Sequence, residues 1–472
     1  MSASPKSELQ QRLRSLPAVG AIIEAHARKT SKKVSPTLIG HLARTLLQSV
    51  RSDLLSGSRE LAPGMDAILR ELEIALEAWP RSRTCRVVNA TGIILHSGLG
   101  RAVLPAAAIA EISTAERYNL LEVAKEDGNR RKRDAFCEDL LCELTGAEAA
   151  IVVNNNAAAT MIILNTLAKD KDVIVSRSQM VEIGGSFRLP DVMEMSGCKL
   201  REVGTTNKSY VYDYERAIHE ETGALMLVHT SNYKIIGFVE HVGIEDMVAL
   251  GKKHDIPVID DLGSGSLIDL SPWGISDNPP VQASVKAQAD VICFSGDKLV
   301  GGPQAGIIVG KKAWIERIRS NHMARALRID KLTCIALEST LKLYLEPETV
   351  LQRVPTLGML TAGVDGLQKK AEVFVKRLKK ILPDAAKPEV IESTSQLGAG
   401  SLPTFQIPTR CLAVQPVGHS ADKIARALRQ RPISIFPRIQ DDRILFDLRT
   451  MRDGDEAIVE QALIEILSED AS

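Results

Sequence analysis

The sequence has few cysteines, and their arrangement argues against two common kinds of site. Its seven cysteines are scattered, and no two of them are spaced as Cys-x-x-Cys. We therefore expect neither a zinc site nor a disulfide framework, and no metal ion. The sequence also lacks a signal-peptide hydrophobic region and any apolar run of about 18 residues. These absences predict a cytoplasmic protein without a membrane segment.

Net charge is also lacking, because 59 basic residues balance 59 acidic ones. The balance hides a basic N-terminal stretch, residues 1–52. Its charged residues are Lys6, Arg12, Arg14, Arg28, Lys29, Lys32, Lys33, Arg44 and Arg51, against Glu8 and Glu24. A basic helical module can bind a polyanion by neutralising phosphates, although such charge runs are more often solvated faces.

A chain of 472 residues predicts two or three domains. Apolar residues at helical spacing over 36–47 and 65–76 predict a helical domain over residues 1–80. Residues 81–335 alternate short Val/Ile-rich runs with helical patterns, which predicts an α/β core with a mainly parallel sheet.

The remaining segment, residues 336–472, mixes helices and strands after a long helical stretch. Apolar runs at 403–407 and 443–447 predict strands, and the pattern at 420–428 predicts a helix. We therefore expect a small C-terminal α+β domain.

Lys298 is the most informative single residue. It follows an apolar run at 289–294 that predicts a buried strand, and glycines at 301 and 302 allow close approach of a flat cofactor. A lysine amine with a lowered pKa attacks aldehydes, so we expect it to hold pyridoxal phosphate (PLP) covalently. Ser295 is placed to bind the cofactor phosphate. The alternative is a surface lysine at a strand end.

Two other strand ends complete a three-part PLP site. The run at 256–261 delivers Asp261 as the expected partner of the pyridine nitrogen, although Asp260 is an equal candidate and either acid could cap a helix. A strand at 149–153 is followed by Asn155, Asn156 and Ala157, which open a helix. Helix N-termini bind phosphate, but an ordinary asparagine cap is the alternative.

Several motifs together resemble bacterial selenocysteine synthase, the L-seryl-tRNA(Sec) selenium transferase family. The likeness covers nearly the whole chain. The motifs that carry it lie at residues 88–96, 100–101, 181–188, 202–207, 229–233, 261–266, 294–299 and 326–333.

This resemblance implies a fold-type-I PLP-dependent transferase whose N-terminal helical domain binds the selenocysteine tRNA, and a homodecamer built from dimers. It implies conversion of seryl-tRNA(Sec) to selenocysteinyl-tRNA(Sec), with loss of the serine hydroxyl and addition of selenium from selenophosphate. Lys298 and Asp297 are then expected to be catalytic. Arg101, Arg325 and Arg328 are expected to bind the phosphate of the donor, and the last two would share a face if their segment is helical.

The family pattern is not matched everywhere. Arg131 stands where members usually have glycine, and a left-handed backbone there would cost about 1 kcal/mol or force another loop conformation. Arg449 is expected to be structural, because an esterified serine has no free carboxylate. Two alternative functions stay open: a PLP-dependent lyase of a free or phosphorylated amino acid, and a catalytically inactive tRNA-binding relative.

Overall fold

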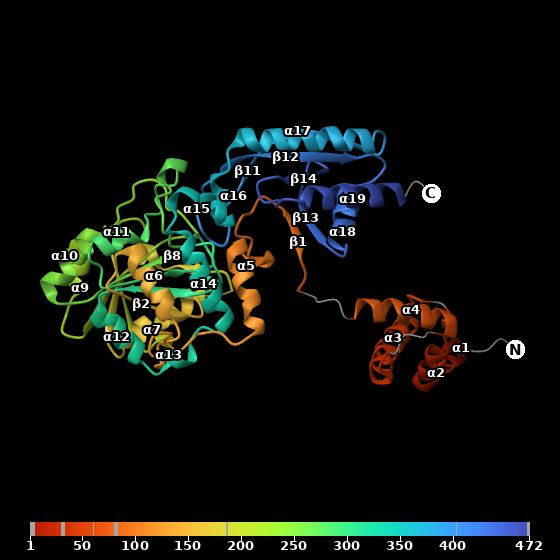
Figure 1. Cartoon of the computed structure of the whole chain (residues 1–472), viewed down its shortest axis with the longest axis horizontal. Coiled ribbons are helices and arrows are strands. Elements are labelled where there is room, and N and C mark those ends of the chain that lie inside the picture. Colours follow the sequence, from red (N-terminus) through yellow and green to blue (C-terminus); the bar gives the residue numbers. More distant parts are fainter. Residues whose placement is uncertain are drawn as a thin grey trace. The chain divides into compact units, whose positions relative to one another are not determined.

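The structure is a computed structural model in which the chain forms two compact units, Met1–Arg86 and Val87–Ser472 (Figure 1). We call them unit 1 and unit 2 and describe each by itself. The described residues are 5–29, 34–59, 61–79, 84–185, 187–402 and 404–469.

Unit 1 is helical. Its described helices are α1 (Pro5–Arg14), α2 (Val19–Lys29), α3 (Pro36–Ser56) and α4 (Met65–Ala78). α3 begins with Pro36 in its first turn and ends at Gly57, whose φ of 78° suits a glycine. Apolar residues such as Ile22, Leu47 and Leu72 form one buried core. The helices predicted at 36–47 and 65–76 are confirmed.

Unit 2 contains a seven-stranded sheet in the order β2-β10-β9-β8-β7-β3-β6. Only β10 runs antiparallel to its neighbours, which confirms the predicted mainly parallel α/β core. The strands are β2 (Ala149–Val153), β10 (Gly306–Gly310), β9 (Val291–Ser295), β8 (Val258–Gly263), β7 (Thr222–Val228), β3 (Asp172–Ser176) and β6 (Lys199–Val203).

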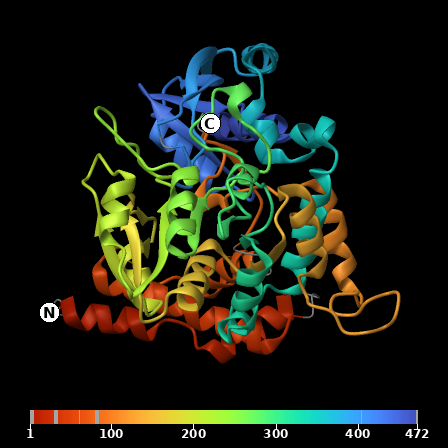
Figure 2. The same ribbon diagram turned by 90° about the vertical axis from the view of Figure 1, so that its left-hand side faces the viewer.

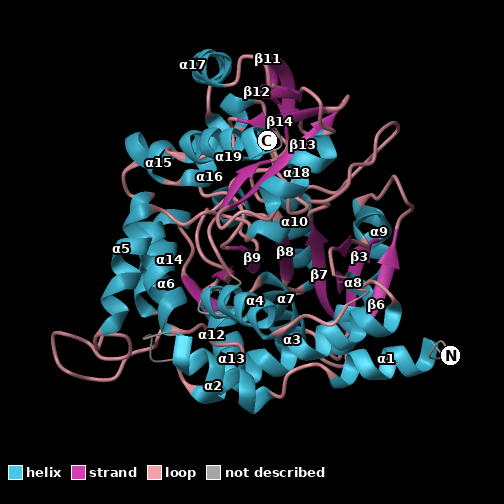
Figure 3. Ribbon diagram, turned by 90° about the vertical axis from the view of Figure 1, so that its right-hand side faces the viewer, coloured by secondary structure: helices cyan, strands magenta, loops and turns pink. Residues whose placement is uncertain are grey.

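Helices cover both faces of this sheet (Figure 3), and two separate apolar clusters form its two sides. This burial explains why the strands read as continuous apolar runs. One cluster includes side chains of α6 (Ala135–Thr145), α9 (Val211–Ala217), α10 (Ile244–His254), α11 (Val281–Lys286) and α14 (Lys331–Leu343). The other includes side chains of α7 (Asn156–Leu167), α8 (Leu189–Met195) and α12 (Lys312–Ser320).

A second sheet of unit 2 has the order β1-β13-β14-β12-β11. Its first strand comes from far upstream in the sequence: β1 pairs in parallel with β13, beside the C-terminal strands (Figure 2). The strands are β1 (Val87–Ala90), β13 (Ser434–Gln440), β14 (Arg443–Asp447), β12 (Ile407–Pro416) and β11 (Ala386–Ser395). Three helices pack on this sheet: α17 (Val364–Ile381), α18 (Ala421–Arg429) and α19 (Asp455–Glu469).

Short elements connect these layers. They are η1 (Ser97–Leu99), α5 (Ala106–Ser113), η2 (Thr114–Glu116), η3 (Arg177–Gln179), β4 (Glu182–Ile183), β5 (Phe187–Arg188), η4 (Ser271–Trp273), α13 (Met323–Ala326), α15 (Pro347–Arg353) and α16 (Pro355–Thr361). Within the described residues, no helix has both the length and the apolar character that crossing a membrane requires.

Of the three elements predicted in the C-terminal segment, two are confirmed and one is misplaced. The strand at 443–447 and the helix at 420–428 are confirmed as β14 and α18. The strand predicted at 403–407 is wrong in its position, because β12 begins only at Ile407. Phe405 instead lies in a turn in which its N–H donates to the carbonyl of Leu402. The division of residues 81–472 into two domains at residue 335 stays a prediction.

Candidate functional site

The residues singled out in the sequence lie at one edge of the seven-stranded sheet. β2, β8 and β9 run in the same direction, so their carboxyl ends meet there. β2 ends just before Asn155, Asp261 lies near the end of β8, and β9 ends at Ser295, shortly before Lys298. Gly306 of β10 pairs with Ser295 on one side and with the end of β2 on the other, which brings the serine close to the Asn155 turn.

Asp261 is buried and is held by three neutral donors. The side-chain amide of Asn156 and the backbone N–H of Gly263 donate to Oδ1 at 2.9 and 3.0 Å. The hydroxyl of Thr160 donates to Oδ2 at 2.9 Å. In the described part of the chain this carboxylate has no ion-pair partner. Its orientation is fixed, and its charge is available for a cationic group such as a protonated pyridine.

The structure separates Asp261 from its neighbour Asp260. Successive side chains of a strand point to opposite faces, so Asp260 points away from the Asn156 turn. Asp260 accepts a hydrogen bond of 2.6 Å from the hydroxyl of Ser284 in α11. Burial raises the pKa of Asp260 to about 6. Of the two acids, only Asp261 contacts Asn156 and Thr160.

Lys298 is almost completely buried, with 5% of its surface exposed. Burial lowers the pKa of its amine, and Arg101 lowers it further, whereas Asp261 and Asp297 act in the opposite direction. Among the described residues, none hydrogen-bonds to this amine. A lowered pKa increases the fraction of neutral amine, which is the nucleophilic form. The alternative of a surface lysine is therefore inconsistent with the structure.

The turn after β2 forms a cradle at the N-terminus of α7. Asn155 caps the helix by accepting a hydrogen bond of 2.9 Å from the N–H of Ala158, as an ordinary asparagine cap does. The N–H groups of Asn156 and Ala157, in the first turn, have no intrahelical partner. A Cβ on Gly306 would lie 2.1 Å from the Asn155 carbonyl oxygen, so only glycine fits beside the turn.

These features fit the phosphate and ring of PLP. Free N–H groups at the helix N-terminus suit a phosphate, and the hydroxyl of Ser295 is buried at the same sheet edge. The side-chain oxygen of Asn156 is buried and has no hydrogen-bond partner, so it is available to a bound ligand. The described residues hold no group of three or more His, Cys, Asp or Glu side chains suited to a metal ion.

Arg101 and Asp297 meet beside Lys298. The Nη1 of Arg101 donates to Oδ2 of Asp297 at 2.7 Å, and the carboxylate is largely buried. Arg101 has a φ of 60°, in the left-handed region. Both residues line one open pocket together with Ser97 and Gln304. Their roles stay a prediction, but the structure places both next to the lysine.

Arg325 and Arg328 line a different pocket, of about 260 Å³. The sequence predicted that the two arginines share a face if their segment is helical. α13 ends at Ala326, so Arg328 lies beyond the helix and the two do not share one helix face. Asn154 lies between this pocket and the Arg101 pocket. Its N–H donates to the carbonyl of Leu327, and its own carbonyl accepts from the Gln304 side chain.

The second pocket is rich in positive charge. Arg328 donates to Glu122 at 3.3 Å, and the same carboxylate pairs with Arg130 and Arg133. Hydrogen bonds from Arg133 and Arg130 lower the pKa of Glu122. Seven cationic side chains line the pocket, so its two acids, Glu122 and Asp134, do not neutralise it.

Arg131 lies in the loop between η2 and α6, drawn in orange at the right of Figure 2, which extends away from the rest of unit 2. Its backbone is outside the left-handed region. Its N–H donates to the carbonyl of Glu122 at 2.9 Å, and the left-handed position is taken by Gly128. The arginine is therefore accommodated without backbone strain.

Arg449 is buried and serves the protein's own backbone. Its guanidinium donates to the carbonyls of Met359, Ala362 and Pro408 at 2.7, 3.0 and 2.7 Å. Burial lowers the pKa of Arg449. These contacts agree with the structural role expected from the sequence.

Two residues of the site received no role in the sequence analysis. Thr160 lies one helical turn after Asn156 and reaches the same carboxylate. His229 follows β7 directly, and its N–H donates to the carbonyl of Asp261 at 2.9 Å. Burial lowers the pKa of His229, which favours its neutral form. The position of His229 could have indicated a role in the site: it is a polar residue just after the buried strand β7, as Lys298 is a polar residue shortly after β9.

Known proteins resemble this chain along nearly its whole length. The L-seryl-tRNA(Sec) selenium transferase of Nitratidesulfovibrio vulgaris is 45% identical over 462 residues, which cover 96% of this chain and 98% of that protein. The enzyme of the same name from Alkaliphilus metalliredigens is also 45% identical, over 457 residues, with 96% and 98% coverage.

A solved structure of D-glucosaminate-6-phosphate ammonia-lyase superimposes with a TM-score of 0.57 at 21% identity, covering 84% of this chain and 99% of that one. This likeness concerns the fold alone, and the predicted fold-type-I architecture is confirmed. The family model described as L-seryl-tRNA selenium transferase matches residues 87–452. With that match and the two close relatives, the chain belongs to the L-seryl-tRNA selenium transferase family.

Proposed function

We propose that this protein converts seryl-tRNA(Sec) to selenocysteinyl-tRNA(Sec) with pyridoxal phosphate as cofactor. The observation that carries the proposal is the buried amine of Lys298 at the strand edge shared with Asp261, in a chain 45% identical to enzymes of that name. A tRNA-binding relative without catalysis would have no need for this arrangement.

Four groups would hold the cofactor. Lys298 would bond to its aldehyde carbon, and Asp261 would face the pyridine nitrogen. The first N–H groups of α7, at Asn156 and Ala157, would bind the phosphate together with Ser295. When bound, PLP withdraws electrons and stabilises negative charge at the α-carbon of the substrate.

The residues around the cofactor would move protons. With its amine free, Lys298 would act as the base for the α-proton, because burial and Arg101 lower its pKa. The Asp261 carboxylate keeps its orientation because three neutral donors hold it. Asp297 orients Arg101 toward the same pocket and stays our second candidate for a catalytic group.

Selenophosphate is the donor that we propose. Guanidinium groups bind phosphate oxygens through paired hydrogen bonds, and Arg101 is the one placed beside Lys298. Arg325 and Arg328 would supply positive charge in the neighbouring pocket, beyond Asn154.

Unit 1 is our candidate for the tRNA-binding part. Its exposed basic side chains include Arg28, Arg44 and Arg51 on α2 and α3. Phosphate contacts by such side chains supply affinity that falls with salt. Assembly into a homodecamer built from dimers and a cytoplasmic location stay predictions from the sequence.

The proposal is tested by incubating the purified, PLP-loaded protein with seryl-tRNA(Sec) and selenophosphate. We expect selenocysteinyl-tRNA(Sec), and a loss of about 10³-fold or more in Lys298→Ala, because that variant lacks both the covalent attachment and the base. Borohydride reduction should fix PLP on the peptide that contains Lys298.

Two results would overturn the assignment. Loaded, folded protein that makes no selenocysteinyl product is the first. The second is efficient elimination from free serine or phosphoserine with no reaction on seryl-tRNA(Sec), which would favour the lyase alternative. Lys312→Ala, an exposed lysine outside the sheet edge, is the matched control and should retain activity.

A further inference from the structure

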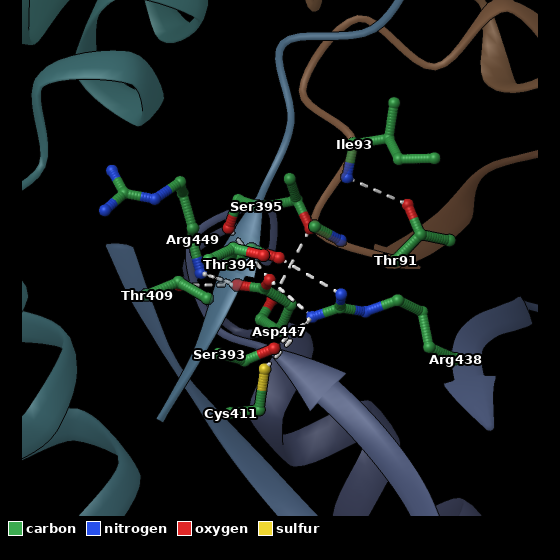
Figure 4. Close-up of polar contacts among 12 residues, drawn as sticks. Thr91, Ile93, Ser393, Thr394, Ser395, Thr409, Cys411, Arg438, Asp447 and Arg449 are labelled. Carbon is green, nitrogen blue, oxygen red and sulfur yellow. Dashed lines mark hydrogen bonds and ion pairs between the residues drawn. The ribbon is translucent and has the colours of Figure 1, made fainter. Parts of the chain in front are cut away.

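Asp447, at the end of β14, is a fully buried carboxylate with an unusually complete set of partners (Figure 4). Its Oδ1 accepts from the hydroxyl of Thr409 at 2.8 Å and from the N–H of Arg449 at 3.1 Å. Its Oδ2 accepts from the hydroxyl of Ser395 at 2.8 Å and from Arg438 at 3.0 Å. Such a carboxylate cannot shift without losing several hydrogen bonds at once.

The segment that follows β1 is fitted against this carboxylate. Gly92 has a φ of 75°, and a Cβ at this position would lie 2.1 Å from Oδ2 of Asp447. The N–H of Gly92 donates to the hydroxyl of Thr450 at 3.1 Å, and its carbonyl accepts from the N–H of Gln396 at 2.8 Å. Figure 4 shows Thr91 and Ile93, the neighbours of Gly92, beside the cluster.

The same segment then runs to the candidate active site. Ile94 and Leu95 donate their N–H groups to the carbonyls of Gln396 and Leu397 at 3.0 and 2.7 Å. After η1, the N–H of Arg101 donates to the carbonyl of His96 at 3.0 Å. We call residues 91–101 the strap. It contacts residues at and just after the strands of the five-stranded sheet at one end, and at the other it reaches the pocket lined by Arg101 and Asp297.

The strap delivers Arg101 in a conformation that needs support. A φ of 60° is unfavourable for a residue with a Cβ, so the surrounding structure must hold it. The support comes from the ion pair with Asp297 and from the anchored strap behind it.

We propose that Asp447, paired with Arg438, is a positioning residue for the reaction: by packing against Gly92, where it leaves no room for a side chain, it sets the strap that carries Arg101 to Asp297 beside Lys298. This inference rests on the proposed function, since the reaction is what Arg101 and Lys298 would serve. It assigns a catalytic contribution to a carboxylate that itself touches neither substrate nor cofactor.

The amine of Lys298 reports the position of Arg101. The charged groups that act on it are Arg101, which lowers its pKa, and Asp261 and Asp297, which raise it. If the strap loses its anchor and Arg101 withdraws, the amine should titrate at higher pH. Around Asp447 the charged side chains are those of Arg438 and Arg449, and the latter is engaged by backbone carbonyls.

The test measures the rate at which PLP attaches to the cofactor-free full-length chain as a function of pH, because the midpoint follows the free amine of Lys298. We expect Asp447→Asn and Gly92→Ala to raise this midpoint by about one pH unit, and Arg101→Gln to raise it at least as much. Adding Asp447→Asn to Arg101→Gln should produce no further shift, since both act through the same charge.

Asp442→Asn is the matched control, because its carboxylate lies in the turn between β13 and β14 and also accepts a hydrogen bond, from the N–H of Ala421. It should leave the midpoint unchanged. If Asp447→Asn fails to fold, Gly92→Ala decides alone. The proposal is overturned when the folded variant keeps the wild-type midpoint while Arg101→Gln raises it. This result is independent of whether wild-type protein makes selenocysteinyl-tRNA(Sec), so the two hypotheses fail separately.

Discussion

Asp261 and Asp447 are both buried carboxylates near the carboxyl end of a strand, one in the seven-stranded sheet of unit 2 and the other in its five-stranded sheet. Asp261 accepts hydrogen bonds only from neutral donors, namely Asn156, Thr160 and a backbone N–H. Asp447 has similar neutral donors but adds an ion pair with Arg438. The main difference between the two sites is therefore one countercharge.

That difference separates two uses of the same side chain. A buried charge without a partner is costly, and such sites persist where a ligand supplies the missing charge. Asp261 matches this description, since a protonated pyridine would complete it. Asp447 is already complete, so its orientation can be used to hold another segment, the strap at Gly92.

Breaking the ion pair between Asp447 and Arg438 should produce the largest effect on stability. Asp447→Leu leaves Arg438 without its partner, and we expect the free energy of unfolding to fall by about 3 to 4 kcal/mol in urea denaturation. Combining it with Arg438→Met should recover only the part of that loss that comes from the unpaired guanidinium, because the hydroxyls of Ser395 and Thr409 and the N–H of Arg449 still lack an acceptor. A loss below about 1 kcal/mol in the single variant would mean that the ion pair is not what distinguishes Asp447.

Asp261→Asn should have little effect on folding and a large effect on activity. Asparagine keeps the shape: its one side-chain oxygen can still accept hydrogen bonds from Asn156 and Gly263, and its NH2 group can donate to the hydroxyl oxygen of Thr160. The charge that would face the pyridine nitrogen is lost, so we expect kcat to fall by about 10²-fold. Steady-state kinetics of selenocysteinyl-tRNA formation measures this effect, with the urea midpoint as the folding control. Unchanged kcat would show that the carboxylate does not act on the cofactor.

The sequence predicted the strand edge because its signals are local. β2, β8 and β9 each appear as an apolar run followed by polar residues, and parallel strands bring those ends together. Local sequence signals could not decide which of Asp260 and Asp261 faces the site. Both faces of β8 are covered by helices, so both side chains are buried and apolar alternation gives no sign of which one faces the site.

The contacts of Asp447 could not be predicted from the sequence, because they too depend on residues that are distant along the chain. Gly92 and Asp447 lie near opposite ends of the sequence of unit 2, although they are in contact in the fold. No pattern near either residue indicates that β1 joins the C-terminal sheet. Glycine at position 92 signals a special backbone conformation but not the partner that requires it. The pocket that contains Arg325 and Arg328 likewise depends on how the loop before α6 folds back.

Asp260 offers the smallest and most specific test, because it differs from Asp261 only by the face to which it points. Its pKa is raised from 3.8 to about 6 by burial, so the folded state binds its proton more tightly than the unfolded state. Its contribution to stability is present below the unfolded pKa and is lost as pH rises through about 6. In Asp260→Asn this loss is absent. Between pH 4 and 7 the variant should therefore gain roughly 2 kcal/mol over the wild type, measured as the difference in free energy of unfolding. Equal pH profiles for Asp260→Asn and the wild type would mean that burial does not raise the pKa of Asp260 in the folded protein.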